Sequence, residues 1–171
     1  MVSSVALIMS LMFLVVPAVS ARCDGVTITK DITCDAPTTI YTGTYQNWYV
    51  TITVENTNSY PINDVVVADR FGGEFGVAER FISHGGAIFS LSGRTEKVHL
   101  VWDIGLLGPG ETATLELNVY TDMNPGEKQE FTSCGTYTMN SGAVVKWLDD
   151  RGKQGSAVTE SIIIIAIPAT T

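Results

Sequence analysis

The segment from Tyr45 to Arg70 places the strongest constraint on the fold of this chain. From Trp48 to Glu55, apolar and polar residues alternate, and this period of two predicts a half-buried strand rich in β-branched side chains. Turn-forming residues follow from Asn56 to Pro61, and a second apolar run covers residues 65–68. We therefore predict a β-hairpin over Tyr45–Arg70 as the centre of the fold.

The same alternation recurs along most of the remaining chain, and no helical period follows Ala21. Strands are predicted at Val26–Ile32, Val98–Ile104, Ala113–Val119, Phe131–Met139, Ala143–Leu148 and Val158–Ile167. Trp102 and Leu115 fall on the apolar faces of their strands and should point into the core. Short strands separated by Gly, Pro, Asn and Asp turns predict an all-β fold, an immunoglobulin-like antiparallel β-sandwich, as a single domain over residues 22–171.

Residues 71–97 are rich in glycine and interrupt the regular pattern. We predict that they form an insertion, either an extra hairpin or a long crossover, that packs on the sandwich. Phe75, Phe81 and Phe89 lie within it and are candidate anchors of an interaction surface. The alternative, that these rings simply cover one sheet, is favoured because large apolar side chains are usually buried.

The C-terminal run Ile162–Ile167 is apolar at successive positions, which predicts burial of both faces of the last strand. Ile163 and Ile165 would then contact either a neighbouring molecule or the rest of the same domain, and the second alternative is favoured. An unpaired strand of this composition would aggregate.

Residues 1–21 contain no charged side chain, and their apolar run from Val5 to Val19 has the length of a signal-peptide core. Small residues around Ala21 fit a cleavage site, so the mature protein should begin at Ala21 or Arg22. This predicts an extracellular or cell-surface protein with no membrane span once the signal is removed. The alternative is a retained N-terminal hydrophobic helix, as in pilin-like subunits.

The chain has 171 residues, a formal net charge of −8 and three cysteines. The acidity argues against a nucleic-acid partner, which requires a basic surface. Export would permit a disulfide. We expect Cys34 and Cys134 to pair within a subunit, with Cys23 free or bonded between subunits. The alternation of the first strand, continued beyond Ile32, places Cys34 on the apolar side, and Cys134 lies on a predicted strand of the sandwich.

The sequence offers few candidates for catalysis or cofactor binding. Ser83 and His84 are adjacent, so on an extended strand their side chains point to opposite sides and do not hydrogen-bond unless a loop folds them together. The turn with Asp149, Asp150 and Gly152 is a weak candidate for Ca²⁺, but its spacing does not match an EF-hand and a solvated turn is favoured. We predict no enzyme and no resident cofactor.

Three segments resemble the prokaryotic surface module called domain of unknown function eleven. They are YVTITVENT (Tyr49–Thr57), DVVVAD (Asp64–Asp69) and WDIGLLGPGETATLELNV (Trp102–Val119), and SGAVVKW (Ser141–Trp147) with TESIIII (Thr159–Ile165) is similar to the end of the module. The resemblance covers most of Val26–Ile167, but the module stands singly here and carries the segment 71–97. It implies an immunoglobulin-like sandwich with a structural, adhesive or assembly role on a cell envelope and no catalytic residues.

We therefore predict a non-enzymatic extracellular subunit that acts by protein–protein contacts in a filament or envelope layer, with copies of itself or other cell-surface proteins as partners. The alternatives are a carbohydrate- or calcium-binding surface module that uses residues 71–97, and the pilin-like subunit with a retained helix.

Overall fold

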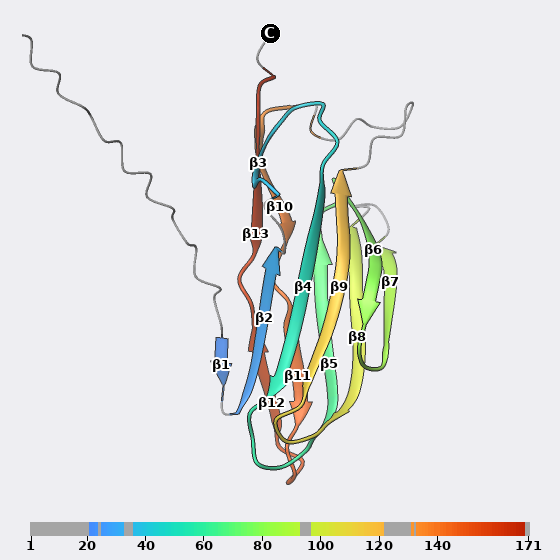
Figure 1. The fold of residues 1–171 in the computed structure, drawn as a ribbon, viewed down its shortest axis with the longest axis vertical. Helices are drawn as coiled ribbons and strands as arrows, with labels where there is room; N and C mark the ends of the chain where they lie inside the picture. Colours follow the sequence, from blue (N-terminus) through green and yellow to red (C-terminus); the bar gives the residue numbers. More distant parts are fainter. Residues whose placement is uncertain are drawn as a thin grey trace, which may run out of the picture.

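The computed structural model of the chain describes residues 21–23, 25–32, 36–92, 97–121, 131 and 133–169. Within these residues the chain forms two β-sheets that pack face to face around one apolar core (Figure 1). Sheet A contains, in spatial order, β1 (Ala21–Cys23), β2 (Val26–Ile32), β4 (Asn47–Asn56), β9 (Thr112–Thr121) and β6 (Phe75–Ile82). The predicted all-β sandwich is confirmed at this level.

Sheet B is larger and is arranged around β5 (Ile62–Phe71). On one side of β5 lies β8 (Lys97–Leu107), followed by β7 (Gly86–Ser92). On the other side lie β11 (Val144–Leu148), which pairs with β12 (Gln154–Val158), and the end of β10 (Gly135–Asn140). The sheet continues from β10 through β13 (Ile162–Ile167) to β3 (Thr39–Tyr41), and β13 pairs with β3 in the parallel direction.

The predicted hairpin over Tyr45–Arg70 is wrong, because β4 and β5 lie in opposite sheets. β4 pairs with β2 and β9, whereas β5 pairs with β8, β10 and β11. Each of the two strands has one apolar face, and facing each other across the core buries both faces at once. The turn residues therefore carry the chain over one end of the sandwich.

Asn56 holds this crossing in place from inside the protein. Its fully buried side-chain amide donates to the carbonyl oxygens of Tyr60, Leu107 and Gly108 at 2.9 to 3.0 Å, and its Oδ1 accepts the Asn58 backbone N–H at 3.1 Å. Buried polar groups of a loop need such partners, since water does not reach them. One amide thus ties the β4–β5 connection to the β8–β9 connection.

The core is formed by the inward positions of both sheets. Trp102 and Leu115 are fully buried, as predicted. Phe75 packs edge-on between Trp48 and Phe131, with ring centroids 5.9 and 5.4 Å apart. The other fully buried large side chains are Ile28, Ile52, Ile62, Phe71, Leu100, Leu107, Leu117 and Met139.

Residues 71–97 contain β6 and β7, which belong to different sheets. β6 pairs with β9 of sheet A and β7 pairs with β8 of sheet B, so this segment crosses between the sheets and extends both. At the crossing, Gly85 has φ of +63°, and a Cβ there would overlap the Asp103 carbonyl oxygen. Phe75 is buried in the core, Phe89 is partly buried against it and Phe81 is 50% exposed.

The prediction for the C-terminal run is wrong in two respects. Residues 158–167 do not form one strand, because the chain leaves β12 at Val158 and enters β13 at Ile162. Nor does the domain itself bury both faces of β13, which was the favoured alternative: Ile164 and Ala166 face the core, whereas Ile163 and Ile165 are 39% and 45% exposed. Sheet B has one face toward the core and one toward solvent, so alternation along the strand decides burial.

Cys134 is exposed and unbonded just before β10, whereas Cys34 lies outside the described residues. The structure therefore gives the expected Cys34–Cys134 disulfide no support. The position before β10 lies at the surface and not in the core. Residues 1–20, and with them the predicted signal peptide, also lie outside the described part. Within that part there is no helix with the length and apolar character needed to cross a membrane.

The assignment of strand faces generates a first prediction. Leu115→Ala should lower the free energy of unfolding by about 2–5 kcal/mol, because it leaves a cavity under sheet A. Glu116→Ala should cost less than about 1 kcal/mol, because Glu116 forms a surface ion pair with Arg80 at 3.3 Å. Urea unfolding of both variants measures this, and equal costs would contradict the assigned faces.

Candidate functional site

A row of apolar side chains crosses the outer, solvent-facing side of sheet B. The strand register places these residues opposite one another on five neighbouring strands: Ile88, Val101, Ala68, Val144 and Val158. Ile88, Val101 and Val158 are 69%, 44% and 51% exposed. Cross-strand neighbours on one face of a sheet contact each other, so the five side chains form one continuous stripe, called here the apolar row.

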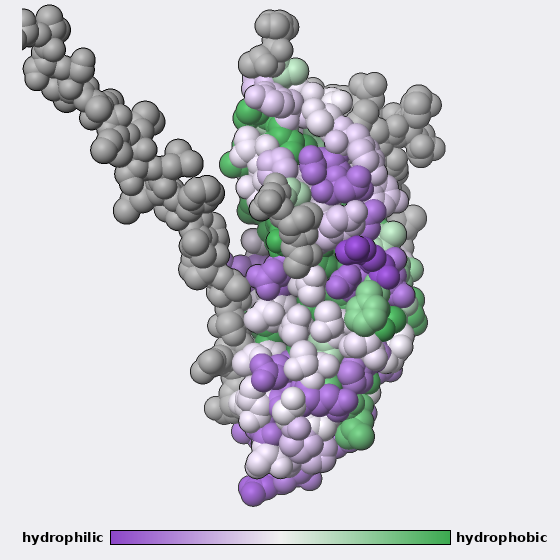
Figure 2. Space-filling model, viewed as in Figure 1, coloured by the Kyte–Doolittle hydropathy of each residue, from purple (hydrophilic) through white to green (hydrophobic). Residues whose placement is uncertain are grey.

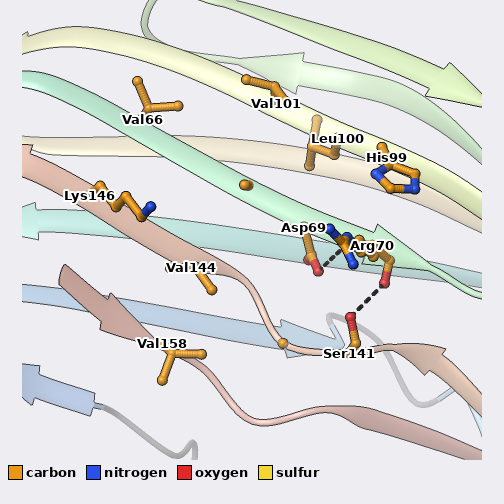
Figure 3. A pocket seen from close by; sticks show the side chains of 12 residues that line it. Val66, Asp69, Arg70, His99, Leu100, Val101, Ser141, Val144, Lys146 and Val158 are labelled. Atoms are coloured by element: carbon orange, nitrogen blue, oxygen red, sulfur yellow. Dashed lines mark hydrogen bonds between the residues drawn. The ribbon is translucent and has the colours of Figure 1, made fainter. Parts of the chain in front are cut away.

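Polar residues border the apolar row on both sides. Ser90, His99 and Arg70 are paired along one border. Along the other border, Asp103 of β8 and Lys146 of β11 both lie opposite Val66 of the strand between them, β5. Figure 3 shows His99 and Arg70 on one border and Val66 and Lys146 on the other, with Val101, Val144 and Val158 between them.

The middle of this face is hollowed into a groove of about 670 Å³. Its lining includes the small residues Ala68 and Gly142 and the polar side chains of Arg70, His99 and Lys146. The lining residues include no Phe, Tyr or Trp. The groove therefore offers aliphatic surface together with the cationic side chains of Arg70 and Lys146, and no Phe, Tyr or Trp ring on which a sugar would stack.

A cluster of buried polar side chains, Lys30, Asp69 and Asn140, lies beside the groove inside the sandwich. Burial raises the pKa of Asp69, while the neighbouring Lys30 charge and hydrogen bonds from Asn140 and the Arg70 backbone lower it. Burial lowers the pKa of Lys30 to about 8, against the raising effect of Asp69. Desolvation is the largest cause in both cases, so the interior favours the neutral forms of both groups.

The structure separates the residues predicted as an interaction surface. Ile163 and Ile165 lie on the outer side of β13 in sheet B, whereas Phe81 lies on β6 of sheet A and Phe75 is in the core. Figure 2 shows that the face formed by sheet A is mostly polar, with isolated apolar residues. The sequence did not predict the apolar row. The local signal it contains is Val101, an apolar residue on the otherwise polar face of its strand.

Ser83 and His84 lie in the bend between β6 and β7. This bend folds their side chains together, as the sequence analysis required for a hydrogen bond between them. Ser83 Oγ lies 2.8 Å from His84 Nδ1, and His84 Nε2 lies 2.9 Å from Glu111 Oε1. Ser83 Oγ also accepts the Thr114 backbone N–H at 2.7 Å, and the His84 carbonyl oxygen accepts the Trp102 indole N–H at 2.7 Å. These contacts tie the β6–β7 bend to strands β8 and β9.

Asp149 is used by its own turn. Its Oδ1 accepts the backbone N–H groups of Arg151 and Lys153 at 2.9 and 2.7 Å. Such an arrangement is typical of a capped, solvated turn. Across the described ranges, no group of three or more His, Cys, Asp or Glu side chains is placed to hold a metal ion.

Comparison with known proteins gives one sequence relative and several structural likenesses. No family model matches the chain. An uncharacterized protein of Archaeoglobus fulgidus is 34% identical over 115 residues, which cover 65% of this chain and 40% of the relative. The chain thus spans well under half the length of that protein.

The solved structures that resemble this fold have low sequence identity. They include a D312A variant of BcpA, the major pilin subunit of Bacillus cereus (13% identity, 85% of this chain and 41% of that chain, TM-score 0.47). The carbohydrate-binding module CBM3b from cellobiohydrolase 9A of Clostridium thermocellum has 13% identity over 85% of this chain and 98% of its own, with a TM-score of 0.41. At these TM-scores the likenesses carry no inference about function.

The contacts of Glu111 generate a prediction on pH dependence. The Gly108 N–H, at 2.7 Å from Oε2, and the His84 ring hold the pKa of Glu111 below its usual range. A lowered carboxyl pKa adds stability above the ordinary glutamate pKa, and this stability is lost as the pH falls through the lower value of the folded state. Glu111→Gln should therefore lower the thermal midpoint at neutral pH, and the difference from wild type should shrink at about pH 3.

Thermal unfolding followed by circular dichroism at both pH values measures the effect. Glu55→Gln, at an exposed position at the end of β4, is the control and should change the midpoint little. A difference between Glu111→Gln and wild type that stays constant with pH would contradict the assignment.

Proposed function

We propose that this chain is a non-enzymatic structural module of the cell surface that binds protein through the apolar row on the outer side of sheet B. The observation that carries the proposal is the register of five exposed or half-exposed aliphatic residues across five strands. A contiguous apolar patch with a polar rim is typical of a protein-binding surface. The resemblance to the surface module and the apolar N-terminal run support an extracellular location.

Charge favours a second copy of the chain as the partner. Arg70 and Lys146 line the groove, while the whole chain has a net charge of −8. The outer side of sheet A carries acidic side chains among its threonines, including Asp31, Glu55 and Glu116. Contact between sheet B of one copy and sheet A of the next is heterologous, and such contacts build open filaments.

A carbohydrate-binding role has less support from the groove. Sugar-binding faces present aromatic rings for stacking, and the residues that line this groove include no Phe, Tyr or Trp. The exposed aromatic side chains Tyr41, Tyr45 and Phe81 lie away from it.

The test places a charge at the centre of the apolar row. Val101→Lys should weaken self-association at least about tenfold, because an ammonium group would have to be buried next to Arg70 and His99. Leu106→Lys is the matched control, since Leu106 lies on the same strand, is 60% exposed and lies outside the row.

Sedimentation velocity over a range of protein concentrations, with electron microscopy of the largest species, measures the association. Equal association of the two variants would contradict the assignment of the row. A wild-type protein that stays monomeric at every concentration would exclude the second copy as partner.

A further inference from the structure

Three polar side chains from three strands meet inside the sandwich, between the two sheets. Lys30 comes from β2 of sheet A, and Asp69 and Asn140 come from β5 and β10 of sheet B. The side chains of Lys30 and Asp69 are 1% and 0% exposed, and Asn140 is fully buried. All three occupy inward positions that their strands otherwise fill with apolar residues.

The contacts among them form a connected set. Lys30 Nζ donates to Asn140 Oδ1, and Asn140 Nδ2 donates to Asp69 Oδ2. Lys30 Nζ lies 3.9 Å from Asp69 Oδ2. The backbone N–H of Gly142 donates to Asn140 Oδ1 at 2.9 Å, and that of Arg70 donates to Asp69 Oδ1 at 2.7 Å. An amine, a carboxamide and a carboxyl group are thus held together away from water.

We propose that Lys30 and Asn140 join covalently, through an isopeptide bond from Lys30 Nζ to Asn140 Cγ, with Asp69 as the proton carrier. The geometry supplies each part that this reaction needs. The nucleophile touches the carboxamide that it attacks, and the proton carrier touches the nitrogen that leaves.

The reaction is an amide exchange that balances without an oxidant, a reductant or water. The lone pair of the neutral Lys30 amine attacks Asn140 Cγ, and the charge that develops on Oδ1 is stabilised by the Gly142 N–H. Asp69, which holds the proton that Lys30 lost on becoming neutral, gives that proton to Nδ2 and then takes one proton from Nζ. The Cγ–Nδ2 bond then breaks and one molecule of ammonia leaves, so the Nζ–Cγ bond replaces the Cγ–Nδ2 bond.

Burial prepares the protonation states for this step. The amine attacks only when it is neutral, and desolvation lowers the pKa of Lys30 to about 8. Desolvation also raises the pKa of Asp69, so this carboxyl group can hold the proton that Lys30 loses. Transfer of that proton from Lys30 to Asp69 converts an ion pair into a neutral pair, and no proton is exchanged with the solvent.

Gly142 positions the stabilising donor. Its φ of +101° lies in the region that glycine adopts without a steric penalty, and a Cβ at this position would lie 2.6 Å from the carbonyl oxygen of Thr159. The glycine therefore allows the turn after β10 to point its N–H at Asn140 Oδ1.

The bond would join sheet A to sheet B across 110 positions of the chain. A pulling force applied to β2 and to the strands after β10 would pass through the bond and not through the strands between them. This property suits a load-bearing surface module, yet the bond itself does not depend on the proposed binding of a partner.

The experiment is peptide mapping of the full-length purified protein by mass spectrometry. Trypsin should fail to cut after Lys30, and a branched peptide should link Lys30 to Asn140 with a mass lower by one ammonia, about 17 Da. Linear peptides that contain unmodified Lys30 and unmodified Asn140 would overturn the inference. A loss of ammonia confined to a linear Asn140 peptide, as in a cyclic imide, would also overturn it.

Two variants test the parts of the site. Asp69→Asn keeps the amine and the carboxamide but removes the proton carrier, so the branched peptide should be lost while circular dichroism still shows a β-rich fold. Lys153→Arg, at an exposed turn position, is the control and should leave the branched peptide unchanged. Undiminished linkage in Asp69→Asn would overturn the role of Asp69. If that variant does not fold, the wild-type map still decides whether the bond exists.

Discussion

The burial of a lysine between two sheets is the constraint on which the arrangement of this protein depends. A charged amine in an apolar interior is strongly unfavourable unless partners from the surrounding structure compensate it. Lys30 lies in phase with Val26 and Ile28 on β2, so its side chain must enter the core. Its partners Asp69 and Asn140 come from the opposite sheet, and this requirement sets which part of β5 and which end of β10 face β2.

The outer faces of sheets A and B differ in composition, although inward and outward side chains alternate along the strands of both sheets. Sheet A shows threonines and carboxylates to solvent, and these are side chains that a solvated β-surface tolerates. Sheet B keeps aliphatic residues at several outward positions, in register across the strands. Covering a surface of this kind lowers the free energy by roughly 25 cal/mol per Å² of buried apolar area. The proposed binding role follows from this asymmetry between the faces.

The sequence predicted individual strands better than their pairing, because alternation is a local property and pairing is not. The inward faces of β8 and β9 were predicted correctly, including the burial of Trp102 and Leu115. The pairing of β4 with β5 was wrong because the turn residues from Asn56 to Pro61 fit a hairpin and a sheet-to-sheet crossing equally well. Asn56 supports the crossing through carbonyl oxygens that lie about fifty positions further along the chain.

The buried polar cluster was missed for a similar reason. Lys30 and Asp69 each occupy an inward position of an alternating strand, and this is the signal that the sequence contains. In the sequence, Lys30 and Asp69 are two separate polar residues at positions where alternation predicts apolar ones, and Asn140 belongs to a predicted turn. Only the packing of sheet A on sheet B brings the three together, so their relation becomes visible only in three dimensions.

A crystal structure of the full-length protein tests the central claim most directly, because it examines the packing of the sheets and the chemistry of the cluster together. The account predicts two facing sheets with continuous electron density from Lys30 Nζ to Asn140 Cγ, and Asp69 in contact with the new amide. Separate, unlinked Lys30 and Asn140 side chains in well-ordered density would contradict the bond. A Lys30 side chain that points to solvent would contradict the buried cluster itself.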